Sequence, residues 1–337
     1  MKPIKICAIC LVAVLAIVSP FAIVIGAATL TPSQYSNTFF GALNEKYDRL
    51  HSIEEPKLVV VGGSSVVFGT DSEMLEKYTG MPVVNFGLYA DLGTKLMLDL
   101  SRPAIGEGDV VVLSPELDPQ TMSLYFSSEN TLKALDDDFS MFRDLGVDNK
   151  LSVLGRMWRF AVDKVELMCT GRVLDPPGVY NAKNFDERGD LVYDRPYNKM
   201  GSPHYLTNKP ISLTEELLDP EFIDYLNEYI ADCERRGATV LFAYCPMNEL
   251  AIDGQDAAAR RQFHEHLDSA LDCEIIGNIE DAVMEAEYFY DSNFHLNDAG
   301  CALRSIRLTE AITAALGMSV TVEEPIPEKP SLPDSDS

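Results

Sequence analysis

The sequence predicts an α/β protein built on a parallel β-sheet with helices on both faces. Short runs of β-branched and aliphatic residues recur along the chain, as in strands that are buried on both faces. Helical stretches of roughly ten residues separate most of these runs, and crossovers of this kind join parallel strands. The strands are expected at residues 58–61, 82–86, 110–114, 238–244 and 274–277.

Helices are expected between these strands and after the last one. The first should begin near Val66, and the others cover residues 71–78, 92–100, 132–142, 151–169, 220–236, 257–270 and 296–316. The α/β rhythm is interrupted by an insertion at about residues 118–219, which we interpret as a lid or substrate-contacting cap. Trp158 falls on the apolar face of a helix in this insertion, and we expect it to pack rather than to bind a ligand.

An uncharged apolar segment near the N-terminus predicts a membrane anchor. Residues 6–30 contain no charged side chain, which is enough to cross a bilayer at about 1.5 Å per residue. Lys2 and Lys5 precede the segment and the next basic residue is Lys46, so the N-terminus is expected in the cytoplasm. Residues 1–32 would then comprise the cytoplasmic N-terminus and the transmembrane anchor. A cleaved signal peptide, with Gly26-Ala27-Ala28 as its cut site, is the alternative. The apolar region of such a peptide usually spans about 7–15 residues, so we favour a retained single-pass anchor.

Composition sets the broad class of the rest. The chain has 53 acidic and 27 basic residues, and this net charge of −26 argues against binding nucleic acid or anionic headgroups. Cys7 and Cys10 lie in the apolar segment, and the other five cysteines form no CxxC pair and no Cys/His ligand spacing, so neither a zinc site nor a dense disulfide framework is indicated. We divide the remainder into a connector (33–56), an extracytoplasmic domain (57–317) and a disordered acidic tail (318–337).

The stretch KLVVVGGSSVVFG, residues 57–69, is the first candidate site. A buried strand ends in Gly62-Gly63, and Ser64 and Ser65 follow at the start of a helix, which is one way to expose a nucleophilic hydroxyl. The glycines allow backbone and substrate to approach closely. The alternative is an ordinary strand-to-helix turn with a serine cap.

The second candidate stretch is YDSNFHLN, residues 290–297. Asp291 lies four residues before His295 in a loop that opens the last helix, so it can orient an imidazole that faces a serine on another loop. The alternative is a structural histidine before a helix cap. The other histidines are in a polar helix, the connector or the insertion: His264, His266, His51 and His204.

Together with the NFGLYA loop at residues 85–90, these motifs resemble the SGNH/GDSL hydrolase superfamily over residues 57–317. The resemblance implies a flavodoxin-like three-layer α/β/α fold, with its serine, aspartate and histidine at the carboxyl edge of the sheet. It implies Ser64 as the nucleophile, with Ser65 as the alternative if the alignment slips by one residue. His295 would be the base and Asp291 its partner.

Three positions depart from the family pattern. Ala90 stands where the family has a glycine whose backbone N–H helps to form the oxyanion hole. Alanine keeps that N–H, and the backbone N–H groups of Ser64 and Ala90 would receive the oxyanion. Glu116 stands where the family has an asparagine donor, and a carboxylate only accepts. Glu116 must therefore be protonated, turned away or used for something else. Finally, the Asp291–His295 spacing is four rather than three, as in a membrane-tethered subgroup similar to cell-wall and exopolysaccharide acyl-transfer factors.

The resemblance implies a membrane-anchored extracytoplasmic esterase or O-acyltransferase that acts on acyl esters of cell-envelope glycans or lipids, with no cofactor and no metal. Hydrolysis and transfer both stay open. The rival is a catalytically impaired domain of the same ancestry that binds glycan or scaffolds an envelope assembly, and Glu116 favours it. A metal-dependent hydrolase using Asp118, Asp291 and His295 is a third interpretation that no ligand spacing supports.

Overall fold

The computed structural model describes residues 3–172, 174–200, 210–252 and 254–332. The chain divides into two compact units. The first comprises Met1–Asn44 and Ser128–Ala182, and the second comprises Glu45–Ser127 and Lys183–Ser337. The predicted insertion at 118–219 therefore contributes residues to both units.

A five-stranded parallel sheet forms the centre of the second unit. Its strand order is β2-β1-β3-β4-β6, and every neighbouring pair is parallel. The strands are β1 (Leu58–Gly62), β2 (Val83–Gly87), β3 (Val110–Ser114), β4 (Thr239–Ala243) and β6 (Glu274–Ile276). All five expected strands are present within one residue at each end, so the predicted α/β class with a parallel sheet is confirmed.

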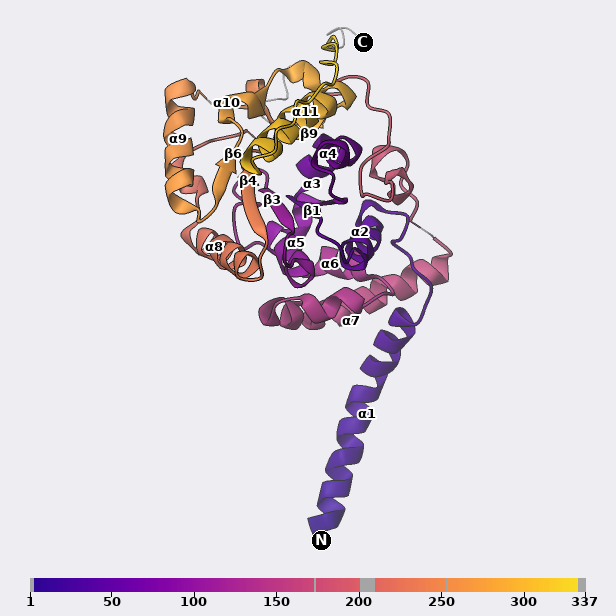
Figure 1. Cartoon of the computed structure of the whole chain (residues 1–337). Helices are drawn as coiled ribbons and strands as arrows, with labels where there is room; N and C mark the ends of the chain where they lie inside the picture. Colours follow the sequence, from indigo (N-terminus) through magenta and orange to yellow (C-terminus); the bar gives the residue numbers. More distant parts are fainter. Residues whose placement is uncertain (1–2, 173, 201–209, 253, 333–337) are drawn as a thin grey trace. The chain divides into compact units, whose positions relative to one another are not determined.

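Helices follow the strands in this unit, and Figure 1 shows α4 and α11 on one side of the sheet and α5 and α8 on the other. They are α3 (Ser64–Gly69), α4 (Ser72–Thr79), α5 (Thr94–Ser101), α8 (Pro220–Arg235), α9 (Ala257–Ala270), α10 (Ile279–Ala282) and α11 (Asp298–Ala315). The last helix begins two residues later than predicted, because Asn297 caps it by accepting from the Gly300 N–H.

The core explains why β1 reads as an unbroken apolar run. Val60 lies on the face that packs with Leu75 of α4 and Leu308 of α11. Successive side chains of a strand point to opposite faces, so Val59 and Val61 face the other helix layer, and both are buried. Each such valine stabilises the fold by about 1.5–3 kcal/mol through apolar burial.

Two short strand pairs complete the second unit and were not predicted. β5 (Met247–Asn248) pairs with β7 (Val283–Met284), and β8 (Phe289–Ser292) pairs antiparallel with β9 (His295–Leu296). The segment expected to be a loop before the last helix is therefore a tight hairpin that contains both Asp291 and His295.

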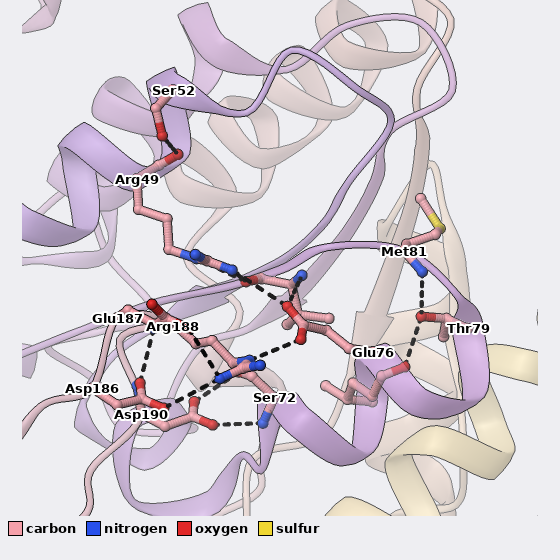
Figure 2. A network of polar contacts seen from close by, with 12 residues as sticks. Arg49, Ser52, Ser72, Glu76, Thr79, Met81, Asp186, Glu187, Arg188 and Asp190 are labelled. Carbon is pink, nitrogen blue, oxygen red and sulfur yellow. Dashed lines mark hydrogen bonds and ion pairs between the residues drawn. The ribbon is translucent and has the colours of Figure 1, made fainter.

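The predicted connector also contains a helix, α2 (Ala42–Ser52), which sequence reasoning did not predict. Its Arg49 donates to Glu76 of α4, and Arg188 donates to the other oxygen of the same carboxylate at 2.8 Å (Figure 2). Beside them, Asp190 accepts from the N–H and the hydroxyl of Ser72. These contacts fix residues 186–190, a part of the predicted insertion, to the edge of the sheet that carries β2.

The first unit contains α1 (Pro3–Thr29), α6 (Ser128–Leu135) and α7 (Val147–Thr170). Within α1, Lys5–Thr29 is long and apolar enough to cross a membrane. The helix predicted at 132–142 begins earlier, at Ser128, and is wrong from Asp136 onward. It ends at Leu135 because Asp136 has a left-handed φ of 47° and begins a run of three aspartates, which are poor helix formers.

Asp136 fixes the segment that follows α1. Its Oδ2 accepts from the N–H groups of Gln34 and Tyr35 at 2.6 and 2.7 Å and from the hydroxyl of Ser33. Its Oδ1 forms an ion pair with the Lys164 Nζ of α7 at 2.6 Å, and both side chains are almost fully buried. The end of the apolar helix is thereby attached to α7.

We expect Lys164→Met to destabilise the protein by about 3–5 kcal/mol, because the variant leaves the Asp136 charge buried without its cation. Arg159→Met on the same helix is the control. Its ion pair with Asp163 is exposed and spans 3.6 Å, so its loss should cost less than about 1 kcal/mol. Thermal unfolding of the detergent-solubilised full chain measures both. Equal shifts for the two variants would contradict the assigned role of the buried pair.

The segment after α11 has neither helix nor strand over residues 318–332. Glu324 forms an ion pair with Lys77 of α4, and the Glu323 N–H donates to the Tyr78 hydroxyl. Residues 333–337 lie outside the described residues, and the disorder expected for the tail stays a prediction.

Candidate active site

The structure brings together three of the side chains that the sequence singled out. The Nε2 of His295 lies 2.7 Å from the Oγ of Ser64, a residue 231 positions away in the chain. The Nδ1 of the same ring lies 2.8 Å from the Oδ1 of Asp291. Both distances are within hydrogen-bond reach, so the three groups form the continuous chain that a serine nucleophile and its base require.

The two adjacent serines differ clearly in geometry. Only Ser64 presents its hydroxyl to His295. The Ser65 hydroxyl is buried and has no hydrogen-bond partner within the described part of the chain, while its backbone N–H donates to Glu116. Of the two candidates, the geometry therefore favours Ser64.

The two glycines before Ser64 are required by close neighbours. A Cβ on Gly62 would lie 2.3 Å from the Ser114 carbonyl oxygen of β3 and 2.6 Å from the Val66 side chain. A Cβ on Gly63 would lie 2.9 Å from the Oε1 of Glu116. The strand, the start of α3 and the end of β3 can approach this closely only because both positions lack a side chain.

Phe68 holds the imidazole from one side. Its ring stacks on that of His295 with centroids 4.0 Å apart and planes 8° apart. The guanidinium of Arg195 lies over the Phe68 ring at 5.4 Å. Phe68 lies one helical turn after Ser64, so α3 supplies both the hydroxyl and the aromatic surface beside its partner. Sequence reasoning missed this role, although the spacing of four residues could have suggested it.

The hairpin that carries Asp291 and His295 is held by buried asparagines. Asn248 donates through Nδ2 to the Asn293 side chain in the hairpin turn at 3.1 Å. Asn297 donates to the carbonyl oxygens of Glu287 and Phe289 at 2.6 and 3.2 Å. These bonds fix the backbone on both sides of His295.

Glu116 follows β3 and points at the serines. Its Oε1 accepts from the Ser64 hydroxyl at 3.0 Å and from the Ser65 N–H at 2.8 Å, and the residue is 1% exposed. Of the three roles left open by the sequence, a carboxylate turned away from the site is therefore wrong.

Counting protons along this chain gives a firm constraint. The three contacts from Asp291 to His295, to Ser64 and to Glu116 need three hydrogens. A serine hydroxyl and a neutral imidazole supply only two, and ionised carboxylates supply none. The complete chain therefore contains one additional proton, either on the imidazole, which then donates from both nitrogens, or on a carboxyl group.

Arg304 supports the site from α11. It is buried, and its Nη1 donates to the Gly69 carbonyl oxygen at 2.7 Å while its Nη2 donates to the Ser114 hydroxyl at 3.0 Å. Burial lowers the pKa of the guanidinium. One side chain thus joins the end of α3 to the end of β3, and no motif in the sequence indicated this link.

Ala90 and Asn85 represent the second family motif. Ala90 begins a short 3₁₀ turn, Ala90–Leu92, where the first N–H has no acceptor within the turn. Its φ is not positive, because Asp136 is the one non-glycine residue with positive φ in the described ranges. Asn85 is buried, and its Nδ2 donates to Asp190 at 2.9 Å, so it links β2 to the fixed segment at residues 186–190.

The remaining candidates do not converge. Within the described residues, no group of three or more His, Cys, Asp or Glu side chains is arranged to hold a metal ion. Asp118 instead accepts from the Gln120 N–H in the turn after β3, and His204 lies outside the described residues. A separate cavity of about 550 Å³ lies between β4, β6 and α11; Arg304 lines it, whereas Ser64 and His295 do not.

Comparison with known proteins gives no assignment. The chain matches no family model, and no curated protein matches it.

Proposed function

We propose that this protein is a membrane-anchored, extracytoplasmic serine esterase or O-acyltransferase of the SGNH type. The observation that carries the proposal is the continuous chain Asp291–His295–Ser64, with contacts of 2.8 and 2.7 Å. When the five strands of this sheet are numbered in chain order, their order across the sheet is 2-1-3-4-5, which is the flavodoxin-like order. Ser64 follows the carboxyl end of β1, where sites of such sheets are found.

The proposed reaction starts with the attack of the Ser64 Oγ on an ester carbonyl. His295 Nε2 takes the serine proton, and Asp291 holds the Nδ1–H and stabilises the imidazolium. The tetrahedral oxyanion is received by the N–H groups of Ser64 and Ala90. Collapse breaks the bond to the leaving alcohol, which takes the proton from His295, and leaves an acyl group on Ser64.

Water or a sugar hydroxyl then resolves the acyl-enzyme, which distinguishes an esterase from an O-acyltransferase. His295 removes the proton of the incoming hydroxyl in either case. The long apolar helix α1 supports a location at the cell membrane, with the N-terminus in the cytoplasm and the site outside. Acyl esters of cell-envelope glycans or lipids are the substrates that fit this location.

The experiment that tests the proposal uses the detergent-solubilised full chain with a chromogenic acetyl ester. We expect release of the alcohol with a burst equal to the number of sites, if deacylation is slower than acylation. Adding an oligosaccharide acceptor should then divide the acyl group between water and sugar. No turnover of any short acyl ester and no burst would oppose the proposal.

A second candidate function is favoured by Glu116. When the Ser64 hydroxyl donates its hydrogen bond to Glu116, its proton does not point at His295. This is expected in an impaired site that serves glycan binding or envelope assembly. The two candidates differ in one measurable respect, because only the enzyme has a serine that reacts with electrophiles.

Phe68 provides a test of how the base is positioned. We expect Phe68→Leu to lower kcat by about 10–100-fold with little change in KM, because the imidazole loses its stacking surface and shifts relative to Ser64. Phe68→Tyr keeps the ring and should retain activity within about threefold. Steady-state kinetics on the acetyl ester measures both variants. A Leu variant as active as the Tyr variant would show that the stack does not position His295.

A further inference from the structure

Helix α7 carries a stripe of large apolar side chains that face solvent. These residues follow one another at intervals of three or four positions, which places them on one face of the helix. They are 40–71% exposed and comprise Val147, Leu151, Leu154, Trp158 and Val162. Soluble monomeric proteins rarely leave a continuous apolar surface of this kind uncovered.

The stripe is distinct from the face that α7 packs inward. The buried side of the helix contains Val153, Met157, Phe160 and Lys164, the last of which forms the ion pair with Asp136. A third side is polar and exposed, and it contains residues such as Ser152, Arg156 and Arg159. The apolar stripe is therefore an additional surface, not the exposed edge of the core.

The position of α7 relative to α1 indicates what covers the stripe. Figure 1 shows α7 crossing beside the C-terminal end of α1, and the rings of Trp158 and Phe21 pack with centroids 4.6 Å apart. Phe21 lies nine residues before the end of the apolar run at Leu30, or about 13 Å along the helix axis. The apolar run of residues 6–30 is about 37 Å long, and the hydrocarbon core of a bilayer is about 30 Å thick, so an α1 centred in the membrane places Phe21 about 10 Å inside the boundary between acyl chains and headgroups.

The composition of α7 fits this depth. Trp158 is the chain's single tryptophan, and tryptophan is enriched at membrane interfaces. Residues 143–172 contain six basic and four acidic side chains, although the whole chain has a net charge of −26. A phosphate-rich headgroup layer therefore repels this region less than it repels the acidic protein as a whole.

We propose that α7 is an interfacial helix whose stripe sinks into the acyl–headgroup boundary of the bilayer that α1 crosses. The inference rests on the part of the proposed function that places α1 in a membrane and not on the serine chemistry. Because the contact surface is apolar, zwitterionic lipid should suffice. The buried Asp136–Lys164 pair, which joins the segment that follows α1 to α7, would hold the helix at this level.

The single tryptophan allows a direct test on the full chain in phosphatidylcholine vesicles with brominated acyl chains, which quench tryptophan fluorescence on contact. Two reporters are compared, Leu151→Trp on the stripe and Arg159→Trp on the polar side, each combined with Trp158→Phe. We expect the Leu151 reporter to lose at least about half of its emission, since interfacial helices bury their apolar face by about 5–10 Å, and the Arg159 reporter to lose little. Trp158→Phe alone gives the background.

Equal quenching of the two reporters, or none in either, would overturn the proposal. Flotation of the same vesicles after alkaline extraction reports separately whether α1 is inserted, so failure of the anchor is distinguished from failure of α7. If a second copy of the chain covered the stripe instead, a Leu151→Cys variant would cross-link to itself and its tryptophan counterpart would stay unquenched. That result would also overturn the proposal.

Discussion

Replacing Ser64 with alanine should lower kcat for a small acyl ester by about 10⁴-fold or more, with the fold unchanged. The reason is that its Oγ is the atom 2.7 Å from the imidazole nitrogen of His295, and the variant removes it. Initial rates of the detergent-solubilised full chain, with thermal unfolding as a check on folding, measure the effect.

Ser65→Ala is the matched control for this variant. The Ser65 hydroxyl has no partner within the described ranges, and the bond from its N–H to Glu116 survives the change. We therefore expect activity within about threefold of the wild type. If Ser65→Ala lost the activity and Ser64→Ala kept it, the assignment of the nucleophile would be displaced by one residue. If neither variant lost activity, the serine mechanism would be wrong.

Glu116→Gln should be at least as active as the wild type in turnover of the acetyl ester. The chain through Asp291, His295, Ser64 and Glu116 contains one additional proton. When that proton is on the imidazole, Glu116 is anionic and His295 cannot take the proton of Ser64. The amide of glutamine carries its own hydrogens, so His295 can stay neutral and take the Ser64 proton, and initial rates on the acetyl ester should equal or exceed those of the wild type.

Glu116→Ala separates a useful carboxyl group from an obstructive one. If Glu116 in its protonated form serves as a donor, the alanine variant should lose about 10²-fold in kcat, as expected when one oxyanion donor is removed. If Glu116 merely holds Ser64 away from the base, the alanine variant should be faster than the wild type. A glutamine variant that is tenfold slower than the wild type would contradict an obstructive role of an ionised Glu116.

The sheet was predictable because its signal is local. Runs such as Val59-Val60-Val61 are apolar on both faces of the strand, so composition alone identifies them. The order of the motifs also placed Ser64 and His295 at the same edge, and the structure brings the two side chains together. The resemblance implied Ser64 as the nucleophile and left Ser65 as the alternative; the contact with His295 separates the two, because a shift of one residue around a helix rotates the hydroxyl by about 100°.

The parts that were missed depend on long-range contacts. Strand β8 has four residues and strand β9 has two, which is too few for a periodic signal in the sequence. Asn248, from another segment, holds this hairpin. Arg304 resembles any basic residue of an amphipathic helix until its bonds to Gly69 and Ser114 are seen. The sequence showed that Glu116 departs from the family pattern. The direction in which its carboxylate points could not be predicted, because it depends on the space that Gly63 leaves for it.

The central claim is that Ser64 is activated by His295, and the most direct measurement is the site of covalent labelling by a fluorophosphonate. Such probes phosphonylate a serine only when a neighbouring base removes its proton. We expect one adduct per chain, located on Ser64 by peptide mass spectrometry and lost in His295→Ala. An unlabelled wild-type protein, or an adduct on Ser65, would contradict it.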